Sequence, residues 1–211
     1  MFGTHDLSLF VISGLLLNIA PGPDSILIMT RSATQGWRAG SAAALGIGTG
    51  TCVHVIAAAL GLSALLATSA LAFTAVKWIG AAYLMYMGLA MLLNRQTGKA
   101  TAATTVPAAM PLRKIFLQGL LTNILNPKVA LFFLAFVPQF IEPLAAHKAL
   151  AFIILGAIFN VNGMLWCHFL VLCSTQASRR FNMPVAAVRW LQCGIGALFF
   201  SFGVRLALTQ R

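Results

Sequence analysis

The chain has 211 residues, of which 60 % are hydrophobic and 8 % charged, and its formal net charge is +11. A soluble domain carries about 25 % charged residues, and a soluble fold of this size cannot hide so much apolar surface. The composition therefore excludes an ordinary soluble protein and predicts an all-α integral membrane protein. The 14 Lys and Arg residues are scattered without a basic stripe, so we expect them to contact the lipid bilayer and not nucleic acid.

Six apolar segments are each close to the length of about 20 residues that a transmembrane helix needs. In chain order they cover residues 7–29, 41–64, 71–93, 115–137, 148–173 and 188–208. The polar stretch 94–114 predicts a loop between two three-helix halves, at about 1–93 and 115–211, of a single transmembrane domain 1–211. The chain starts without the basic stretch of a signal peptide, so we expect the first segment to stay in the mature protein.

The first segment contains NIAPGPDSILI, which starts at Asn18. Pro21 and Pro23 lack N–H donors, and Gly22 allows unusual backbone angles, so we expect the helix to break here and restart near Asp24. Asp24 could serve only to cap the new half-helix. However, a charge inside the membrane costs about 2.5–3.5 kcal/mol, which favours a polar site with a function.

The fourth segment contains a second predicted break, in the sequence LTNILNPKVALFF. Pro127 interrupts the helix, Asn123 and Asn126 can bond the freed backbone, and Lys128 adds a positive charge. Lys128 could instead extend its ammonium group to the membrane surface, although it lies near the middle of the segment. Because Asp24 and Lys128 are opposite charges well inside segments, we hypothesise that they form an internal pair.

The second and fifth segments add small and titratable residues. Gly46 and Gly50 form the G-x-x-x-G spacing of closely packed membrane helices, which permits a homodimer but does not require one. His54 and His168 could relay protons, because histidine changes charge near neutral pH. Either histidine could equally be a structural residue held by hydrogen bonds. Asn160 and Asn162 of the fifth segment could face the same cavity as the breaks.

The two halves show traces of a repeat. Residues 76–79 (VKWI) open the third segment, residues 188–191 (VRWL) open the sixth, and the first segment of each half has an interior Asn and Pro. An odd number of helices per half inserts the halves in opposite orientations. The sequence therefore predicts two inverted three-helix repeats, with helices 1 and 4 broken at proline.

The orientation follows from the Lys and Arg residues in the gaps, because the more basic side faces the cytoplasm. One side receives Arg31, Arg38, Arg95, Lys99, Arg113, Lys114, Arg179, Arg180 and Arg189. The other side receives Lys77, Lys148, Arg205 and Arg211. The count predicts that both termini face away from the cytoplasm.

Several enzyme classes lack their motifs here. The chain has no phosphate-binding loop, no H-E-x-x-H and no G-x-S-x-G, and it has only three acidic residues. We therefore expect no enzymatic activity, no cofactor and no metal site. Cys52, Cys167, Cys173 and Cys193 form no C-x-x-C motif. A membrane thiol/disulfide electron carrier and a metal-ion exporter remain alternatives, although the breaks hold few soft metal ligands.

Taken together, four stretches resemble the LysE/RhtB family of bacterial amino-acid exporters over nearly the whole chain. They are PGPD at 21–24, KWIGAAYL at 77–84, NPK at 126–128 and PQF at 138–140. The resemblance implies a multi-pass protein of the bacterial inner membrane that expels amino acids or their derivatives, driven by the proton motive force. It also implies that both breaks lie on the substrate path and that the termini, given the orientation above, are periplasmic.

The resemblance assigns these residues to the substrate and coupling path: Asn18, Pro21, Gly22, Pro23, Asp24, Asn123, Asn126, Pro127 and Lys128. Asp24, His54 and His168 are the candidate proton carriers. The motifs are shared by family members with different substrates, so they do not identify the amino acid. A cationic substrate would need more negative charge than Asp24 supplies, so we expect a neutral amino acid.

Overall fold

The computed structural model describes residues 3–62, 109–142 and 145–177, together with short pieces between 74 and 93 and between 193 and 207. Within these ranges the chain is helical and has no β-strand, apart from one isolated bridge between Thr4 and Ile141. The predicted segments 71–93 and 188–208, and the repeated motif that opens them, lie largely outside the described residues.

The first half begins with a broken helix followed by a straight one. Helices α1 (Leu7–Ile19) and α2 (Pro23–Gln35) meet at an angle of 55°. Gly36 has a φ of 82°, a left-handed value that glycine adopts without strain, and it connects α2 directly to α3 (Trp37–Ala57). A short π-helical turn, Ala58–Leu62, continues α3.

The second half repeats this order. Helices α6 (Leu112–Ile124) and α7 (Pro127–Leu131) belong to a pair bent by 47°. A π-helical turn (Phe132–Phe136) and a 3-10 turn (Val137–Phe140) extend α7. The long straight helix α8 (Lys148–Ala177) follows.

Four of the six predicted segments fall within spans of sufficient length and apolarity to cross a membrane. The straight spans are Trp37–Gly61 and Lys148–Gln176, and each bent pair can form one more. The predicted boundaries were too narrow in two places. Helix covers the expected gap 30–40 except at Gly36, and Leu112 to Lys114 belong to α6 and not to the loop 94–114. Polar, straight-chain residues such as Gln35 and Lys114 favour helix, so polarity alone misplaced these ends.

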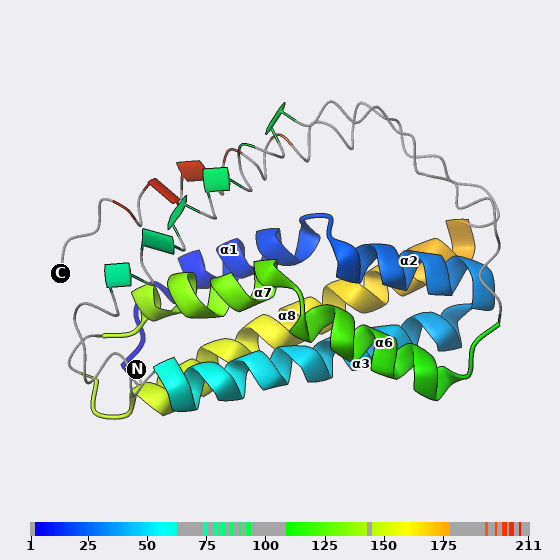
Figure 1. Ribbon diagram of the computed structural model, residues 1–211, viewed down its shortest axis with the longest axis horizontal. Coiled ribbons are helices and arrows are strands. Elements are labelled where there is room, and N and C mark those ends of the chain that lie inside the picture. The colour runs from blue at the N-terminus through cyan, green and yellow to red at the C-terminus, as the bar shows by residue number, and fades with distance from the viewer. Residues whose placement is uncertain are drawn as a thin grey trace.

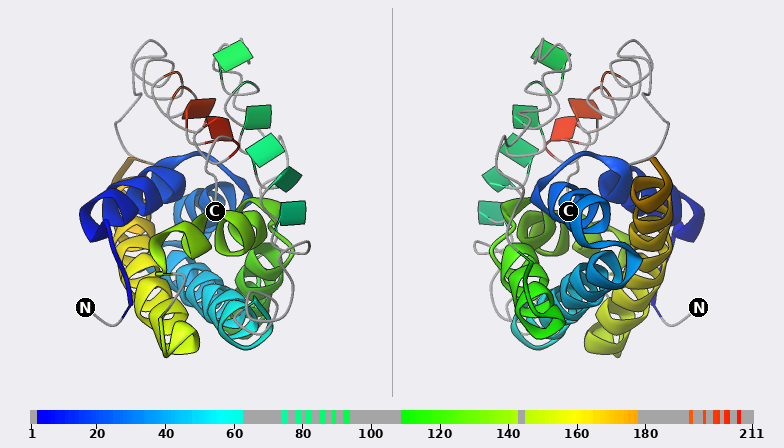
Figure 2. Two further views of the ribbon diagram at one scale, coloured as in Figure 1. Left: turned by 90° about the vertical axis from the view of Figure 1, so that its left-hand side faces the viewer. Right: turned by 90° about the vertical axis from the view of Figure 1, so that its right-hand side faces the viewer.

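The described helices of the two halves run in opposite directions. In Figure 1 the pair α1–α2 runs from left to right and the pair α6–α7 from right to left, and α3 and α8 are opposed in the same way. Seen end-on in Figure 2, α8 lies between α1 and α3, and α3 also packs against α6. The two bent pairs therefore both run along the bundle and pack against the straight helices α3 and α8.

The distribution of polarity is the reverse of that in a soluble protein. Many large apolar side chains are exposed, among them Leu60, Leu125 and Leu165, while Lys128 and Asn123 are buried. An apolar exterior around polar interior groups is stable only where the surrounding solvent is lipid. The described helices thus support a multi-pass membrane protein.

Close packing of α3 on α6 confirms the interpretation of the G-x-x-x-G motif. A Cβ atom at Gly46 would overlap the carbonyl oxygen of Phe116, and one at Gly50 would lie 2.8 Å from the side chain of Asn123. Gly119 of α6 faces the backbone of Ala43 in the same way. The glycines therefore allow close contact between the two halves of one chain.

We expect Gly46→Ala to destabilise the protein by roughly 1–3 kcal/mol, because the added methyl group meets backbone atoms that cannot move without displacing α6. Thermal melting in detergent measures the effect. Gly61→Ala is the matched control, since no other described segment comes within 4 Å of the position of its Cβ. Equal melting temperatures for the two variants would contradict the close approach of α3 and α6.

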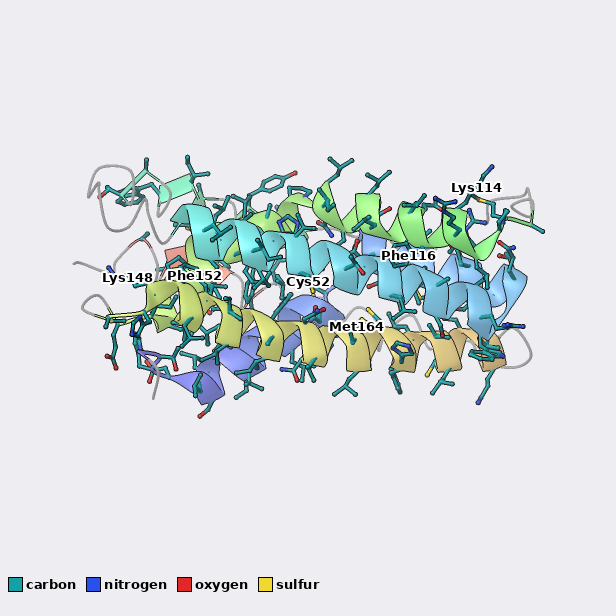
Figure 3. All side chains as sticks on the ribbon, turned by 90° about the horizontal axis from the view of Figure 1, so that it is seen from below. Cys52, Lys114, Phe116, Lys148, Phe152 and Met164 are labelled. Carbon is teal, nitrogen blue, oxygen red and sulfur yellow. The ribbon has the colours of Figure 1, made fainter. Side chains whose placement is uncertain are left out.

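Arg31 does not lie in a gap as predicted but within α2, where only 6 % of the residue is exposed. Its guanidinium donates to Gln35 Oε1 at 3.1 Å, to Gln118 Oε1 at 3.0 Å and to Met110 Sδ at 2.7 Å. These bonds join α2 to α6 at the end of the bundle that carries Arg38, Arg113 and Lys114. Figure 3 places Lys114 and Lys148 at opposite ends, as the charge count requires.

Candidate functional site

The two helix breaks have the same local construction. In each pair the second half-helix begins with a proline followed by a charged residue, Pro23–Asp24 in α2 and Pro127–Lys128 in α7. Proline suits the first helical position because its missing N–H has no partner there, and it keeps the preceding residue extended. Gly22 and Asn126 accordingly adopt extended angles and end the preceding helical path.

Asp24 is bonded to the other break. Its Oδ2 accepts from Asn123 Nδ2 at 2.8 Å and from Asn126 Nδ2 at 3.1 Å. Asp24 also lies in the first turn of α2, where the helix dipole favours negative charge. Its Oδ1 is buried and has no hydrogen-bond partner among the described residues. One carboxylate oxygen thus holds the two halves together, and the other is open.

Lys128 makes the reciprocal contact with the first break. It is 8 % exposed, and its Nζ donates to the carbonyl oxygens of Leu17 and Ala20, each at 3.0 Å. The break leaves these carbonyls at the end of α1 without helical partners, and the negative end of the helix dipole favours a cation. An ammonium has three donors, so one N–H remains for another acceptor. Lys128 is thus held inside the protein and does not reach the membrane surface.

The hypothesised Asp24–Lys128 ion pair is not formed in this conformation. In the described part of the chain the only salt bridge joins His5 and Asp6. Asn126 connects the two residues through the backbone of Lys128 instead, since its Nδ2 donates to Asp24 while its Oδ1 accepts from the backbone N–H of Lys128 at 3.1 Å. Each charge therefore keeps capacity for a ligand.

Further polar side chains surround Asn123. His54 Nε2 lies 3.1 Å from the carbonyl oxygen of Asn123, which can only accept, so the ring donates there. The imidazole stacks on Phe133 with a centroid distance of 6.2 Å. Thr51 Oγ1 lies 3.4 Å from Asn123 Oδ1. Asn123 therefore links α3 to both breaks.

A small cavity of about 30 Å³ lies at the breaks. Asp24, Lys128 and Asn123 line it, with further walls from α1, α3 and α8. Figure 3 shows Met164, one of the lining residues, about halfway along the bundle. A buried water needs roughly 10–15 Å³ by this measure, so the cavity has room for about two waters and not for an amino acid.

Comparisons with known proteins identify the chain's relatives. Residues 15–210 match the LysE type translocator family. The chain belongs to this family. It is 33 % identical over 211 residues to an uncharacterized membrane protein of Pseudomonas aeruginosa. This alignment covers 97 % of this chain and 96 % of that protein. It is 28 % identical over 209 residues to the leucine efflux protein of Salmonella typhimurium, covering 99 % and 98 %. No solved structure matches.

The LysE type translocator fold brings most of the predicted path residues together. Asn18, Asp24, Asn123 and Lys128 line the cavity, and Asn126 bonds Asp24. The remaining predicted residues form the breaks themselves: Pro21, Gly22, Pro23 and Pro127.

The candidate proton carriers are not equally placed in the LysE type fold. Asp24 lines the cavity, and His54 lies behind Asn123. His168 does not line the cavity: its Nδ1 lies 2.9 Å from the carbonyl oxygen of Met164, and it borders a separate, open groove on α8.

Sequence reasoning missed most of the wall that α8 contributes. Asn160 and Asn162 were expected there, and of these only Asn160 lines the cavity. Gly163, Met164, Trp166 and Cys167 line it and were not expected. A signal did exist for part of this wall, because residues 160, 163, 164 and 167 share the spacing of one helix face. Trp166 carries no such signal, since an isolated tryptophan in an apolar helix indicates nothing about its partners.

Glycines make room for the polar side chains of the site. A Cβ at Gly22 would lie 3.3 Å from Lys128 Nζ, and one at Gly163 would lie 3.2 Å from Asn18 Oδ1. Gly50 faces Asn123 in the same manner, at 2.8 Å. The glycine-rich composition thus serves the site as well as helix packing.

Proposed function

We propose that this chain is a secondary exporter of amino acids or their derivatives across the bacterial inner membrane, with a preference for neutral amino acids. The observation that carries the proposal is the reciprocal placement of Asp24 and Lys128 at two crossing helix breaks around a cavity inside the bundle. Membership of the LysE type translocator family and similarity to a leucine efflux protein support it.

The open atoms of the site suit the head group of an amino acid. The ammonium group binds Asp24 Oδ1, which has no partner, and the carboxylate accepts the remaining N–H of Lys128. A zwitterion with a neutral side chain adds no net charge to a site that already balances one anion and one cation. A lysine or arginine side chain would leave an uncompensated positive charge, which is costly inside the membrane.

The antiparallel course of the two halves supports an inverted repeat and alternating access. Each half supplies one charged residue at the same place, directly after the proline that follows its break. In such transporters the repeats rock around a central site. Because the cavity is too small for an amino acid in this conformation, substrate binding and transport require it to widen.

Distinct contacts close the two ends. At one end, the hydrogen bonds of Arg31 to Gln118 and Met110 link the halves. At the other, Phe10 packs against Phe140 with ring centroids 5.2 Å apart. In our proposal the Arg31 end faces the cytoplasm, both termini are periplasmic, and the two contacts open alternately.

Export is coupled to the proton motive force in this proposal. Asp24 is the leading proton carrier because it is the only carboxylate among the residues that line the cavity, and its Oδ1 has no hydrogen-bond partner among the described residues. Outside the cell the substrate leaves, and a proton takes the place of its ammonium group on Asp24. The site then returns to the cytoplasmic side with Asp24 uncharged. His54 is the second candidate, because it contacts the carbonyl oxygen of Asn123, which lines the cavity.

No observation favours the thiol or metal alternatives. The four cysteines are free, and only Cys167 lines the cavity. Among the described residues no group of three His, Cys, Asp or Glu is arranged to hold a metal ion.

The test is export from cells fed a panel of dipeptides, which are hydrolysed inside the cell to raise single amino acids. We expect the wild type, but not an empty vector, to accumulate neutral amino acids such as leucine or threonine outside the cell faster than lysine or arginine. Extracellular chromatography gives the rates.

A variant with all four cysteines replaced by serine is the control for thiol chemistry and should export at the wild-type rate. If no amino acid accumulates despite confirmed membrane insertion, the proposed function is wrong. Loss of export in the cysteine-free variant would revive the thiol carrier.

A further inference from the structure

In the part of the chain that the structure describes, three polar atoms of residues that line the cavity are buried without a hydrogen-bond partner. They are Asp24 Oδ1, Asn18 Nδ2 and Trp166 Nε1. Buried polar groups are nearly always bonded, so each open atom calls for an explanation, and a group shared with a ligand site is one of them. The proposed function uses Asp24 Oδ1 for the ammonium group and leaves the other two atoms unexplained.

The two unexplained atoms, Asn18 Nδ2 and Trp166 Nε1, are hydrogen-bond donors, and the tryptophan side chain has no acceptor atom. An indole N–H only donates, so Trp166 Nε1 cannot be satisfied by a cation or by another donor. The nearby aromatic ring of Phe169 stacks on Trp166 with a centroid distance of 5.3 Å, which restricts the orientation of the indole. Asn18 Nδ2 comes from the last turn of α1, on a different wall of the cavity.

A carboxylate is the ligand group that fits this arrangement. Its two oxygens offer about four lone-pair sites, enough for the remaining N–H of Lys128 and for both neutral donors. Both donors are buried in this conformation, so the substrate carboxylate would reach them as the cavity widens. An amide or amine in place of the carboxylate lacks the negative charge and leaves donors unbonded.

We propose that Trp166 Nε1 and Asn18 Nδ2 bind the α-carboxylate of the substrate and make the exporter select free amino acids over their amides and amines. This inference rests on the proposed function. Trp166 and Asn18 are specificity-determining residues, since sites that donate to a substrate group reject analogues without it. Other residues of the opened cavity then recognise the side chain of the substrate.

The test uses full-length protein in liposomes, with uptake of labelled leucine and competition by unlabelled leucine, leucinamide and isoamylamine. Trp166→Phe keeps the ring and removes only the N–H. We expect the KM for leucine to rise about tenfold with kcat nearly unchanged, while inhibition by leucinamide changes less than twofold. The preference for leucine over leucinamide therefore falls by a similar factor.

Trp37→Phe is the matched control, because Trp37 is 60 % exposed at the start of α3 and does not line the cavity. Asn18→Asp is a second, nearly isosteric variant. It places a negative charge against the carboxylate, so leucine recognition should be lost while isoamylamine inhibition is kept or strengthened.

Two results would overturn the inference while leaving the proposed function intact. One is a wild-type KM for leucine in Trp166→Phe. The other is an equal loss of leucine and leucinamide recognition in both variants, which indicates a structural role. Failure of wild-type protein to recognise leucine or any amino acid of the export panel instead contradicts the proposed function, and this inference with it.

Discussion

Replacing Asp24 with asparagine should reduce amino-acid export at least about 100-fold while leaving the protein folded. The substitution keeps the shape of the side chain and one acceptor for Asn123, but it removes the charge that binds the substrate ammonium. Losing one partner of a buried, bonded charge pair costs about 2–5 kcal/mol, and every 1.4 kcal/mol is a factor of about ten. Asparagine also cannot carry a proton. The initial rate of efflux from preloaded cells measures the effect.

Asp6→Asn is the matched control, because the side chain of Asp6 is 58 % exposed and bonds only to His5 in the described structure. A second assay separates the two roles of Asp24. If Asp24 carries only the proton, Asp24→Asn retains the exchange of labelled for unlabelled substrate, which needs no net proton movement. If it binds the ammonium group, exchange is lost as well. Proton-driven export at the wild-type rate would show that Asp24 does neither.

The breaks and their residues were predictable from the sequence because they depend on local chemistry. Proline removes a donor wherever it stands, so Pro23 and Pro127 predict the ends of half-helices without knowledge of the fold. The charge of Asp24 and Lys128 inside apolar segments predicts a function on energetic grounds alone.

The partners of these residues were not predictable, because they depend on tertiary distances. The sequence suggests a direct Asp24–Lys128 pair, whereas the structure gives each charge a partner at the opposite break and places Asn126 between them. Trp166 likewise lines the cavity because of how α8 is oriented about its axis, which the sequence does not give. Sequence patterns determine which face of a helix is polar, but not which atom meets which.

Replacing Lys128 with methionine should lower both stability and export, unlike the change at Asp24. Methionine matches the unbranched stem but leaves the carbonyl oxygens of Leu17 and Ala20 without their bonds and removes the positive charge from the cavity. Breaking a buried charge interaction from one side costs about 3–5 kcal/mol. We therefore expect a clear fall in melting temperature in detergent, and export below about 1 % of the wild-type rate. Lys114→Met, an exposed lysine in the first turn of α6, is the control.

The double variant Asp24→Asn, Lys128→Met tests whether the two charges compensate each other without touching. If they do, Lys128→Met leaves the charge of Asp24 uncompensated, and the second substitution removes that energetic cost. The double variant then melts at a higher temperature than Lys128→Met alone. Export stays absent, because neither end of the substrate zwitterion has its partner. Additive destabilisation would instead show that Lys128 acts only as the cap of α1.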